Sequence, residues 1–427
     1  MHKNSLRIDW KYRLLRMFLQ IRNDTFIALL TGGTGLMSQF QSIDVADYYD
    51  KDTFDRIEAF AKDKPTPFVV IDTQIVAKQY DDMVNNFPFA NIYYAVKANP
   101  AKEILTLLRD KGSNFDIASI YELEMVTSIG VSADRISYGN TIKKRVDVRS
   151  FFEQGVRMFA SDSEADLRMI AEEAPGSKVY LRILTEGTHT ADWPLSRKFG
   201  CQNEMAYDLL VLAKELGLQP HGISFHVGSQ QRDIGAWDSA IGKVKSIYDR
   251  LKEEHGIVLK MINLGGGFPA NYMDKTNELG VYAQQIKHFL EEDFGDELPE
   301  IILEPGRSLL SNAGVLVSEV VLISRKSNTA LERWVFTDVG KFSGLIETMD
   351  EAIKFPIYTE RKGELDKCVI AGPTCDSADI MYEHYSYGLP VDLAIGDRMY
   401  WLTAGAYTTT YSAVCFNGFP PLKDYYL

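Results

Sequence analysis

The feature that most constrains this chain is an alternation, from residue 67 to residue 307, of short β-rich runs with segments of helical periodicity. The predicted strands are Ile92–Val96, Phe115–Ala118, Ile136–Tyr138, Met158–Ala160, Val179–Ile183, Gly222–Val227, Met261–Leu264 and Ile301–Leu303. Helical segments such as Trp237–His255 lie between them. Eight strands alternating with helices over about 240 residues predict a (β/α)8 barrel of the TIM type.

After Arg307 the pattern changes to β-rich runs separated by turn residues, with little helical periodicity. The predicted strands of this part are Val315–Arg325, Trp334–Thr337, Lys367–Ala371 and Arg398–Leu402. They predict a C-terminal all-β domain of sandwich or barrel type. We therefore expect a barrel over residues 67–309 and a β-domain over residues 310–427, with residues 37–66 joining the β-domain.

Residues 1–36 differ from the rest of the chain, because they carry six Lys or Arg and two Asp in a protein of net charge −13. A transit peptide is also basic, but it is rich in Ser and poor in acidic residues. We expect this stretch to be a leader outside the folded core, with Met37 as an alternative start of translation. A targeting or membrane-surface helix and an ordered extension are the two alternatives.

Net charge and cysteine content limit which binding partners and which cellular compartment the protein can have. The excess of 59 acidic over 46 basic side chains argues against a nucleic-acid partner, which calls for a basic surface. The four cysteines have no paired spacing and no accompanying His cluster, so we expect no disulfide scaffold, no metal site and a reducing cytoplasm. The longest apolar stretch near the start, Phe26–Leu30, is far shorter than the ~20 residues of a membrane span, so we expect no membrane association.

In a barrel of this type the chemistry lies at the carboxyl ends of the strands. Lys97 directly follows the first strand. It marks either the point where the strand reaches solvent or a reactive amine, whose pKa apolar neighbours would lower and which could form an imine with an aldehyde. Arg182 lies inside the apolar fifth strand, and a buried arginine requires an acidic or phosphate partner. A structural ion pair explains Arg182 equally well.

Polar residues also follow the second and sixth strands. The second strand ends near Asp116, and Glu122 follows a turn later, where the helix dipole favours an acid. That structural role is the better explanation of Glu122. His226 and Ser229 follow the sixth strand. A lone histidine is more often a core residue than a catalyst, but this strand exit offers backbone N–H groups and a hydroxyl to a phosphate.

The last two strand ends favour an anion. Gly265, Gly266 and Gly267 follow the seventh strand, and successive glycine N–H groups can form an anion-binding nest, although plain turns also contain such triplets. Glu304 and Arg307 follow the eighth strand, where phosphate sites are common in such barrels.

Together these strand ends describe a site for a phosphate cofactor that carries an aldehyde, and pyridoxal 5'-phosphate satisfies all of its requirements. Lys97 would bind the aldehyde, the glycines and Arg307 the phosphate, and Glu304 the ring nitrogen. A carboxylate on that nitrogen keeps the pyridine protonated, which makes the ring an electron sink.

Longer motifs carry a resemblance that covers residues 48–419 in consistent order. They are YYAVKAN, FDIAS, HVGS, LGGGFP and EPGR in the barrel, and GPTCDSAD and GAY in the β-domain. The chain resembles the barrel-fold pyridoxal-phosphate decarboxylases of basic amino acids, and in particular the ornithine decarboxylases. As a set, these motifs are highly specific for that family.

The resemblance implies a role for each matching residue. Lys97 binds the cofactor covalently, His226 stacks on its ring and Glu304 contacts the pyridine nitrogen. Glu122 matches an acid that supports the pocket. The other implied cofactor-binding residues are Asp116, Arg182, Ser229, Gly265, Gly266, Gly267, Arg307 and Tyr407.

The family also implies a homodimer with shared active sites, to which the partner subunit contributes Cys375 and Asp376. Cys375 is the expected donor of the proton that replaces the carboxylate at Cα, since a thiol near an electropositive cofactor can titrate near neutrality. Outside the CDSAD motif, it would be interpreted as a small buried hydrophobe. Lys198 and Asp379 match a pair that bridges the subunits.

The implied reaction is decarboxylation of the diamino acid L-ornithine to putrescine in polyamine biosynthesis, with L-lysine to cadaverine as a second activity. Asp376 and Asp350 are the expected carboxylates for the distal ammonium group of the substrate. Two acids without an added basic residue favour this substrate type over diaminopimelate. The segment SGLIETMDEA departs from the family pattern, so the preference between ornithine and lysine stays open, because one methylene discriminates by only ~1–3 kcal/mol.

Two alternatives remain on the same fold. One is a diaminopimelate decarboxylase-like enzyme, and the other is a catalytically inactive, decarboxylase-like regulator. An inactive regulator should have lost parts of the site, whereas this chain keeps all of the motif residues. A racemase is expected to carry a basic residue where Glu304 stands.

Overall fold

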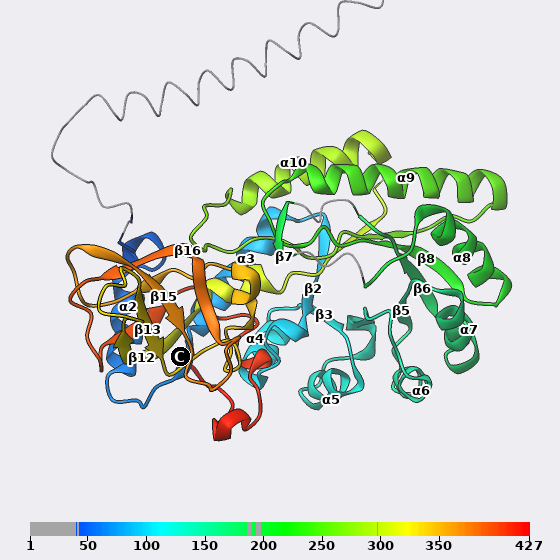
Figure 1. Ribbon diagram of the computed structural model, residues 1–427. Coiled ribbons are helices and arrows are strands. Elements are labelled where there is room, and N and C mark those ends of the chain that lie inside the picture. Colours follow the sequence, from blue (N-terminus) through cyan, green and yellow to red (C-terminus); the bar gives the residue numbers. More distant parts are fainter. Residues whose placement is uncertain (1–39, 41, 186–189, 194–197, 297) are drawn as a thin grey trace, which may run out of the picture. The chain divides into compact units, whose positions relative to one another are not determined.

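The computed structural model describes residues 40, 42–185, 190–193, 198–296 and 298–427, and the predicted leader of residues 1–36 lies outside them. In the described part of the chain, eight parallel strands close a barrel (Figure 1), which confirms the predicted (β/α)8 architecture. These strands are β2 (Ala90–Ala95), β3 (Asn114–Ile117), β4 (Ile136–Tyr138), β5 (Met158–Ser161), β6 (Lys178–Arg182), β8 (Gln219–Ser224), β10 (Met261–Asn263) and β11 (Glu300–Leu303). Each overlaps one of the predicted strands.

Helices cover the outside of the barrel, and α9 and α10 lie side by side along it (Figure 1). The helices that follow barrel strands are α4 (Lys102–Asp110), α5 (Ile120–Ser128), α6 (Arg145–Glu153), α7 (Glu164–Glu173), α8 (Asn203–Glu215), α9 (Gly235–His255), α10 (Leu279–Phe294) and α11 (Arg307–Leu310), and α3 (Thr73–Asn86) precedes β2. Their buried faces join the outward-facing strand residues in one large apolar core.

The inside of the barrel is also packed. Because side chains alternate along a strand, the neighbours of outward-facing residues point inward. Those inward residues form a separate buried cluster, contributed by five of the strands. Its members are Tyr93, Ala160, Tyr180, Met261 and Ile302. This filled interior closes the barrel below the strand ends, so a ligand can be held only at the rim.

The second sheet has strands from both ends of the described chain. Its main path runs β14 (Ile357–Tyr358), β17 (Arg398–Trp401), β12 (Gly314–Ser324), β13 (Arg333–Thr337), β15 (Leu365–Ala371) and β16 (Ile380–Pro390). Off this path, β1 (Phe68–Ile71) pairs with β12, and β18 (Lys423–Tyr426) pairs with β1. This sheet confirms the predicted β-domain. β13 and β15 pair in parallel, and the other pairs along the path are antiparallel.

Strand β1 corrects the predicted start of the barrel at residue 67. It pairs antiparallel with β12 and parallel with β18, and therefore belongs to the second sheet. Phe68 and Val70 are buried on one face of the strand and Val69 and Ile71 on the other. A short run that is buried on both faces has no periodicity to distinguish a sheet strand from a barrel strand.

Helix α2 (Lys51–Ala61) packs on the outer face of the second sheet. Asp50 caps its first turn by accepting a hydrogen bond from the Thr53 N–H at 2.8 Å. Phe54 and Ile57 lie in one buried cluster with Phe68 and Val70 of β1 and with residues of β12 and β17. The sheet is therefore covered by residues that precede the barrel in the sequence.

None of the helices within the described residues has both the length and the apolar character that a bilayer crossing requires.

Replacing Ile57 by alanine tests the packing of α2 on the sheet. Ile57 is fully buried, so Ile57→Ala removes apolar contacts and leaves a cavity, and we expect the free energy of unfolding to fall by about 2–5 kcal/mol. Urea denaturation followed by circular dichroism measures the change. Lys62→Ala, at the exposed end of the same helix, is the matched control and should change stability by less than about 0.5 kcal/mol. Equal effects of the two variants would show that α2 does not pack as described.

Candidate active site

A cavity of about 250 Å³ opens at the carboxyl ends of the barrel strands. Nine of the residues predicted from the sequence line it: Lys97, Asp116, Arg182, His226, Ser229, Gly267, Glu304, Arg307 and Tyr407. They come from six different strand ends and, with Tyr407, from the β-domain. The geometry thus brings together residues that lie up to 310 positions apart in the sequence.

Lys97 lies in a one-turn 3-10 helix, η2 (Val96–Ala98), directly after β2. It is surrounded by protein, but its side chain is accessible through the cavity. Burial acts to lower the pKa of Lys97, but the negative charges of Asp116 and Glu304, with Tyr407, outweigh burial and raise this pKa above its ordinary value. The expectation of a lowered pKa is therefore wrong, because Lys97 faces carboxylates and not apolar neighbours alone.

Asp116, at the end of β3, is the most strongly perturbed acid of the cavity. Burial and the nearby charge of Glu304 raise the pKa of Asp116 well above its ordinary value. Its Oδ1 atom is buried and has no hydrogen-bond partner among the described residues. A Cβ atom at Gly139 would lie 1.9 Å from that oxygen, so only glycine leaves room for this carboxylate. An unsatisfied buried acceptor beside a cavity is the kind of group that a bound ligand completes.

Glu304 follows β11, and the Asn263 side-chain amide donates a hydrogen bond to it. Arg182 ends β6, with its guanidinium 4.9 Å from the ring of Phe199. Burial lowers the pKa of Arg182, while the charges of Glu304 and Asp116 act in the opposite direction. These two carboxylates are the acidic neighbours that a buried arginine requires.

His226 is an uncharged ring at neutral pH. Burial, with the positive charges of Arg182 and Lys97, lowers the pKa of His226 well below its ordinary value. Its Nδ1 atom accepts a hydrogen bond from the Gly228 N–H at 3.0 Å, so the proton of the neutral ring lies on Nε2. A histidine held in this way presents a flat apolar face and is a poor proton acceptor, which fits a residue that packs against a ligand ring.

The glycine run after β10 has a structural demand of its own. A Cβ atom at Gly266 would lie 2.5 Å from the Glu304 carbonyl oxygen, so a side chain would push apart the ends of β10 and β11. Gly265 donates its N–H to the Asn263 side chain at 2.9 Å. Gly267 lines the cavity, whereas Gly265 and Gly266 are not among its lining residues. The run therefore serves close strand packing as well as the cavity wall.

Arg307 is held by a residue that sequence reasoning missed. Its guanidinium makes a two-pronged ion pair with Glu347, at 2.8 and 2.6 Å, and both side chains are buried. Glu347 belongs to η6 (Ile346–Glu351) of the β-domain and lines the cavity. The sequence pointed to Glu347 only weakly: it is the one acid in the stretch GLIET, within a segment that departs from the family pattern. Phe199, Asn140 and Tyr411 also line the cavity and were missed.

Besides Gly265 and Gly266, three residues of the predicted site do not line this cavity. Cys375 and Asp376 are exposed in the loop between β15 and β16, where the Cys375 N–H donates to Asn417 and Asp376 accepts from the Ala378 N–H. Asp350 is exposed too, with a φ of 53°. A single chain thus leaves the expected proton donor and both substrate acids on its surface.

Two further predicted residues have roles inside the chain. Glu122 accepts a hydrogen bond from the Ala118 N–H at 2.6 Å, and its own N–H donates to the Ser119 hydroxyl, a reciprocal cap at the start of α5. This confirms the structural explanation of Glu122. Asp379 is 2% exposed and accepts hydrogen bonds from Lys341 and Thr374, so the carboxylate expected to bridge subunits is engaged within its own chain.

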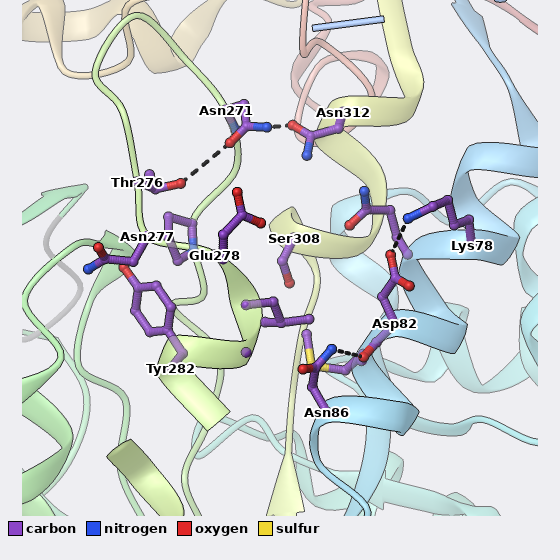
Figure 2. Close-up of a pocket in the computed structure, with 15 residues that line it drawn as sticks. Lys78, Asp82, Asn86, Asn271, Thr276, Asn277, Glu278, Tyr282, Ser308 and Asn312 are labelled. Carbon is purple, nitrogen blue, oxygen red and sulfur yellow. Dashed lines mark hydrogen bonds and ion pairs between the residues drawn. The ribbon is translucent and has the colours of Figure 1, made fainter. Parts of the chain in front are cut away.

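A second hollow lies between α3, α10 and the segments that follow β10 and β11 (Figure 2). Amide side chains and the exposed end of the Lys78–Asp82 ion pair line it. None of the predicted site residues contributes to it, so the chemistry belongs to the cavity at the barrel rim.

The rim cavity fits pyridoxal 5'-phosphate. It holds one accessible amine, Lys97, a carboxylate for a ring nitrogen, Glu304, and an unsatisfied acceptor, Asp116. An arginine and the Ser229 hydroxyl lie side by side for a phosphate, with the Arg307 Nε 3.0 Å from the serine oxygen. The neutral His226 ring supplies a flat wall.

Comparison with known proteins agrees with this cofactor. Residues 73–311 match the pyridoxal-binding domain of pyridoxal-dependent decarboxylases. The chain is 32% identical to the lysine/ornithine decarboxylase of Selenomonas ruminantium, over 85% of this chain and 90% of the relative, and 32% identical to the ornithine decarboxylase of Schizosaccharomyces pombe, over 88% of each.

Among solved structures, the lysine/ornithine decarboxylase of Vibrio vulnificus complexed with putrescine superposes with a TM-score of 0.78 at 29% identity, covering 88% of this chain and 99% of that one. The matched domain starts at residue 73, after β1, in agreement with the place of β1 in the second sheet. The chain belongs to the family of barrel-fold, pyridoxal-dependent amino-acid decarboxylases, and pyridoxal 5'-phosphate is its cofactor.

Proposed function

We propose that this enzyme decarboxylates L-ornithine to putrescine and accepts L-lysine as a second substrate, in polyamine biosynthesis. The observation that carries the proposal is the rim cavity, in which nine predicted cofactor-binding residues from distant strand ends meet. The names of two relatives, which pair lysine with ornithine, support the substrate class. Free thiols at Cys375 and Cys415, both exposed, support a reducing cytoplasm as the site of action.

Each residue of the cavity has a separate task. Lys97 would hold the cofactor through its aldehyde, and Glu304 would hold the proton of the ring nitrogen. The bound cofactor supplies an electron sink for the bond between Cα and the carboxylate. His226, which is neutral, would pack against the ring without competing for its proton. Arg307, Ser229 and Tyr407 would hold the phosphate.

Proton movement at Lys97 depends on its neighbours. The raised pKa of Lys97 means that the amine is protonated at neutral pH and must lose this proton before it can attack an aldehyde. The charge of Asp116 is the largest contribution that raises this pKa, and burial and Glu304 raise the pKa of Asp116 itself, which favours its uptake of a proton. Asp116 is therefore the proposed acceptor of the Lys97 proton.

The proposed active form is a homodimer, because Cys375, Asp376 and Asp350 lie on the surface of one chain. Exposed apolar side chains accompany them: Met349, Tyr411, Val414, Phe416 and Phe419 are each at least 38% exposed. The Asn417 side chain ties this last segment to Cys375 at 2.9 Å. An apolar surface that carries the missing catalytic residues favours burial against a second copy of the chain.

The purified protein with its cofactor should show a visible absorbance band and should release CO2 from ornithine and lysine faster than from diaminopimelate and arginine. Lys97→Ala should lose both the band and CO2 release, because no other amine is placed for the cofactor aldehyde among the residues that line the described cavity. Lys102→Ala, which removes an exposed lysine five positions later, is the matched control and should retain both. A fully active Lys97→Ala variant would refute the assignment, and a preference for diaminopimelate would replace the proposed substrate.

Removing the Asp116 charge should shift the pH dependence of cofactor attachment. In Asp116→Asn, burial still lowers the pKa of Lys97 while its main opposing charge is gone, so the amine loses its proton at lower pH. The rate at which the absorbance band forms, measured from pH 6 to 10 after pyridoxal phosphate is added to cofactor-free protein, should rise at a lower pH than in the wild type. Asp110→Asn, an exposed acid in α4, should leave the profile unchanged. A shift toward higher pH would contradict the role given to Asp116.

Hybrid dimers test the shared site. Lys97→Ala and Cys375→Ala proteins damage different parts of the site, so a mixed dimer with shared sites contains one intact site. Mixing the two variants should raise CO2 release toward about a quarter of the wild-type value per chain, because half of the dimers are mixed and each has one of two sites intact. If subunits exchange, as shown by tagged copies, and no activity returns, then each site is built from a single chain.

A further inference from the structure

Glu347 brings a third carboxylate into the cofactor cavity, opposite the arginine expected to bind phosphate. Its side chain is 3% exposed and that of Arg307 is 4% exposed, so the ion pair is shielded from water. Tyr411 and Tyr407 line the cavity beside them, and the charge of Glu347 contributes to raising the pKa of both phenols. A buried carboxylate in this place acts on any anion that Arg307 binds.

The hydrogen bonds of Arg307 show how much of it is left for a phosphate. The guanidinium has five N–H groups. Nε donates to the Ser229 hydroxyl at 3.0 Å, and Nη1 donates to the Tyr272 hydroxyl and to Glu347, each at 2.8 Å. Nη2 donates once, to Glu347 at 2.6 Å. Among the described residues, one N–H group, on Nη2, therefore has no protein acceptor.

The charge of Arg307 is largely cancelled as well. The negative charge of Glu347 is the largest contribution that raises the pKa of Arg307 well above its ordinary value, which shows how strongly the two charges interact. In a water-shielded cavity the same carboxylate repels a phosphate dianion placed beside Arg307. Glu347 thus opposes the binding that Arg307 favours.

We propose that Glu347 is a positioning residue that limits how strongly Arg307 binds the cofactor phosphate. Glu347 fixes the guanidinium so that a single N–H group is available to the phosphate, and its negative charge offsets the charge of Arg307. The inference rests on the proposed function only in taking the rim cavity as the cofactor site. If the carboxylate is removed, Ser229 and Tyr272 still hold the Arg307 guanidinium in place. The effect on phosphate binding therefore comes from the lost negative charge and not from a displaced guanidinium.

Glu347→Gln tests the proposal, because the amide has the same shape, can still accept one N–H and carries no charge. The readout compares pyridoxal phosphate with pyridoxal, which lacks the phosphate, by titrating cofactor-free full-length protein and following absorbance. We expect the dissociation constant of pyridoxal phosphate to fall about tenfold, which corresponds to 1.4 kcal/mol. The dissociation constant of pyridoxal should stay within about twofold of its wild-type value. The ratio of the pyridoxal constant to the pyridoxal phosphate constant should therefore rise about tenfold.

Two further variants complete the experiment. Glu347→Asp keeps the negative charge but places it one methylene farther from Arg307, so it should shift the ratio in the same direction by a smaller factor. This variant also tests the proposal if Glu347→Gln does not fold. Glu360→Gln removes an exposed acid elsewhere in the β-domain and should leave the ratio at its wild-type value.

An unchanged or lower ratio in both Glu347 variants would overturn the inference, because it would make Glu347 a purely structural partner or a help to phosphate binding. This outcome is separate from failure of the proposed function. If the wild-type protein binds neither ligand with an absorbance change, then the cavity is not the cofactor site. If the wild type binds both and the ratio does not respond to Glu347, then only the role of Glu347 fails.

Discussion

The balance of charge inside the rim cavity is the constraint on which the rest of the site depends. Three cations, Lys97, Arg182 and Arg307, share the cavity at the carboxyl ends of the barrel strands with three carboxylates. Burying any of these charges alone would be costly, so each requires a counter-charge nearby. The shifted pKa values follow from this balance: that of Lys97 rises because of its acidic neighbours, and that of Asp116 rises because burial and Glu304 act together.

The two parts of the fold share the task of supplying these charges. The barrel brings Lys97, Asp116, Arg182 and Glu304 to one rim because its strands run in parallel and all end there. Glu347 and Tyr407 come from the β-domain. The Tyr407 N–H donates to the Ala98 carbonyl at 3.0 Å, which ties the β-domain to the residue after Lys97. The cavity therefore forms only where both parts meet.

The sequence predicts what is local and misses what depends on long-range contacts. The eight barrel strands could be predicted because short β-rich runs alternate with segments of helical periodicity. Lys97 and Glu304 could be identified because each directly follows such a run. The place of β1 could not, since four buried residues in a row fit either sheet. The pKa of Lys97 was misjudged because its carboxylate neighbours come from two other strands. Glu347 was missed because its partner lies 40 residues away.

The same balance bears on which substrate the cavity suits. With three charges of each sign, the cavity itself is formally neutral, and a phosphate dianion makes it anionic. A substrate that brings a second ammonium group has a net positive charge and offsets part of this negative charge in a place where unpaired charge is costly. Ornithine and lysine both bring that group, whereas the distal end of diaminopimelate carries a carboxylate beside its ammonium and adds no net charge. Charge therefore separates the diamino acids from diaminopimelate, while the choice between ornithine and lysine, which carry the same charge, is left to the length of the pocket.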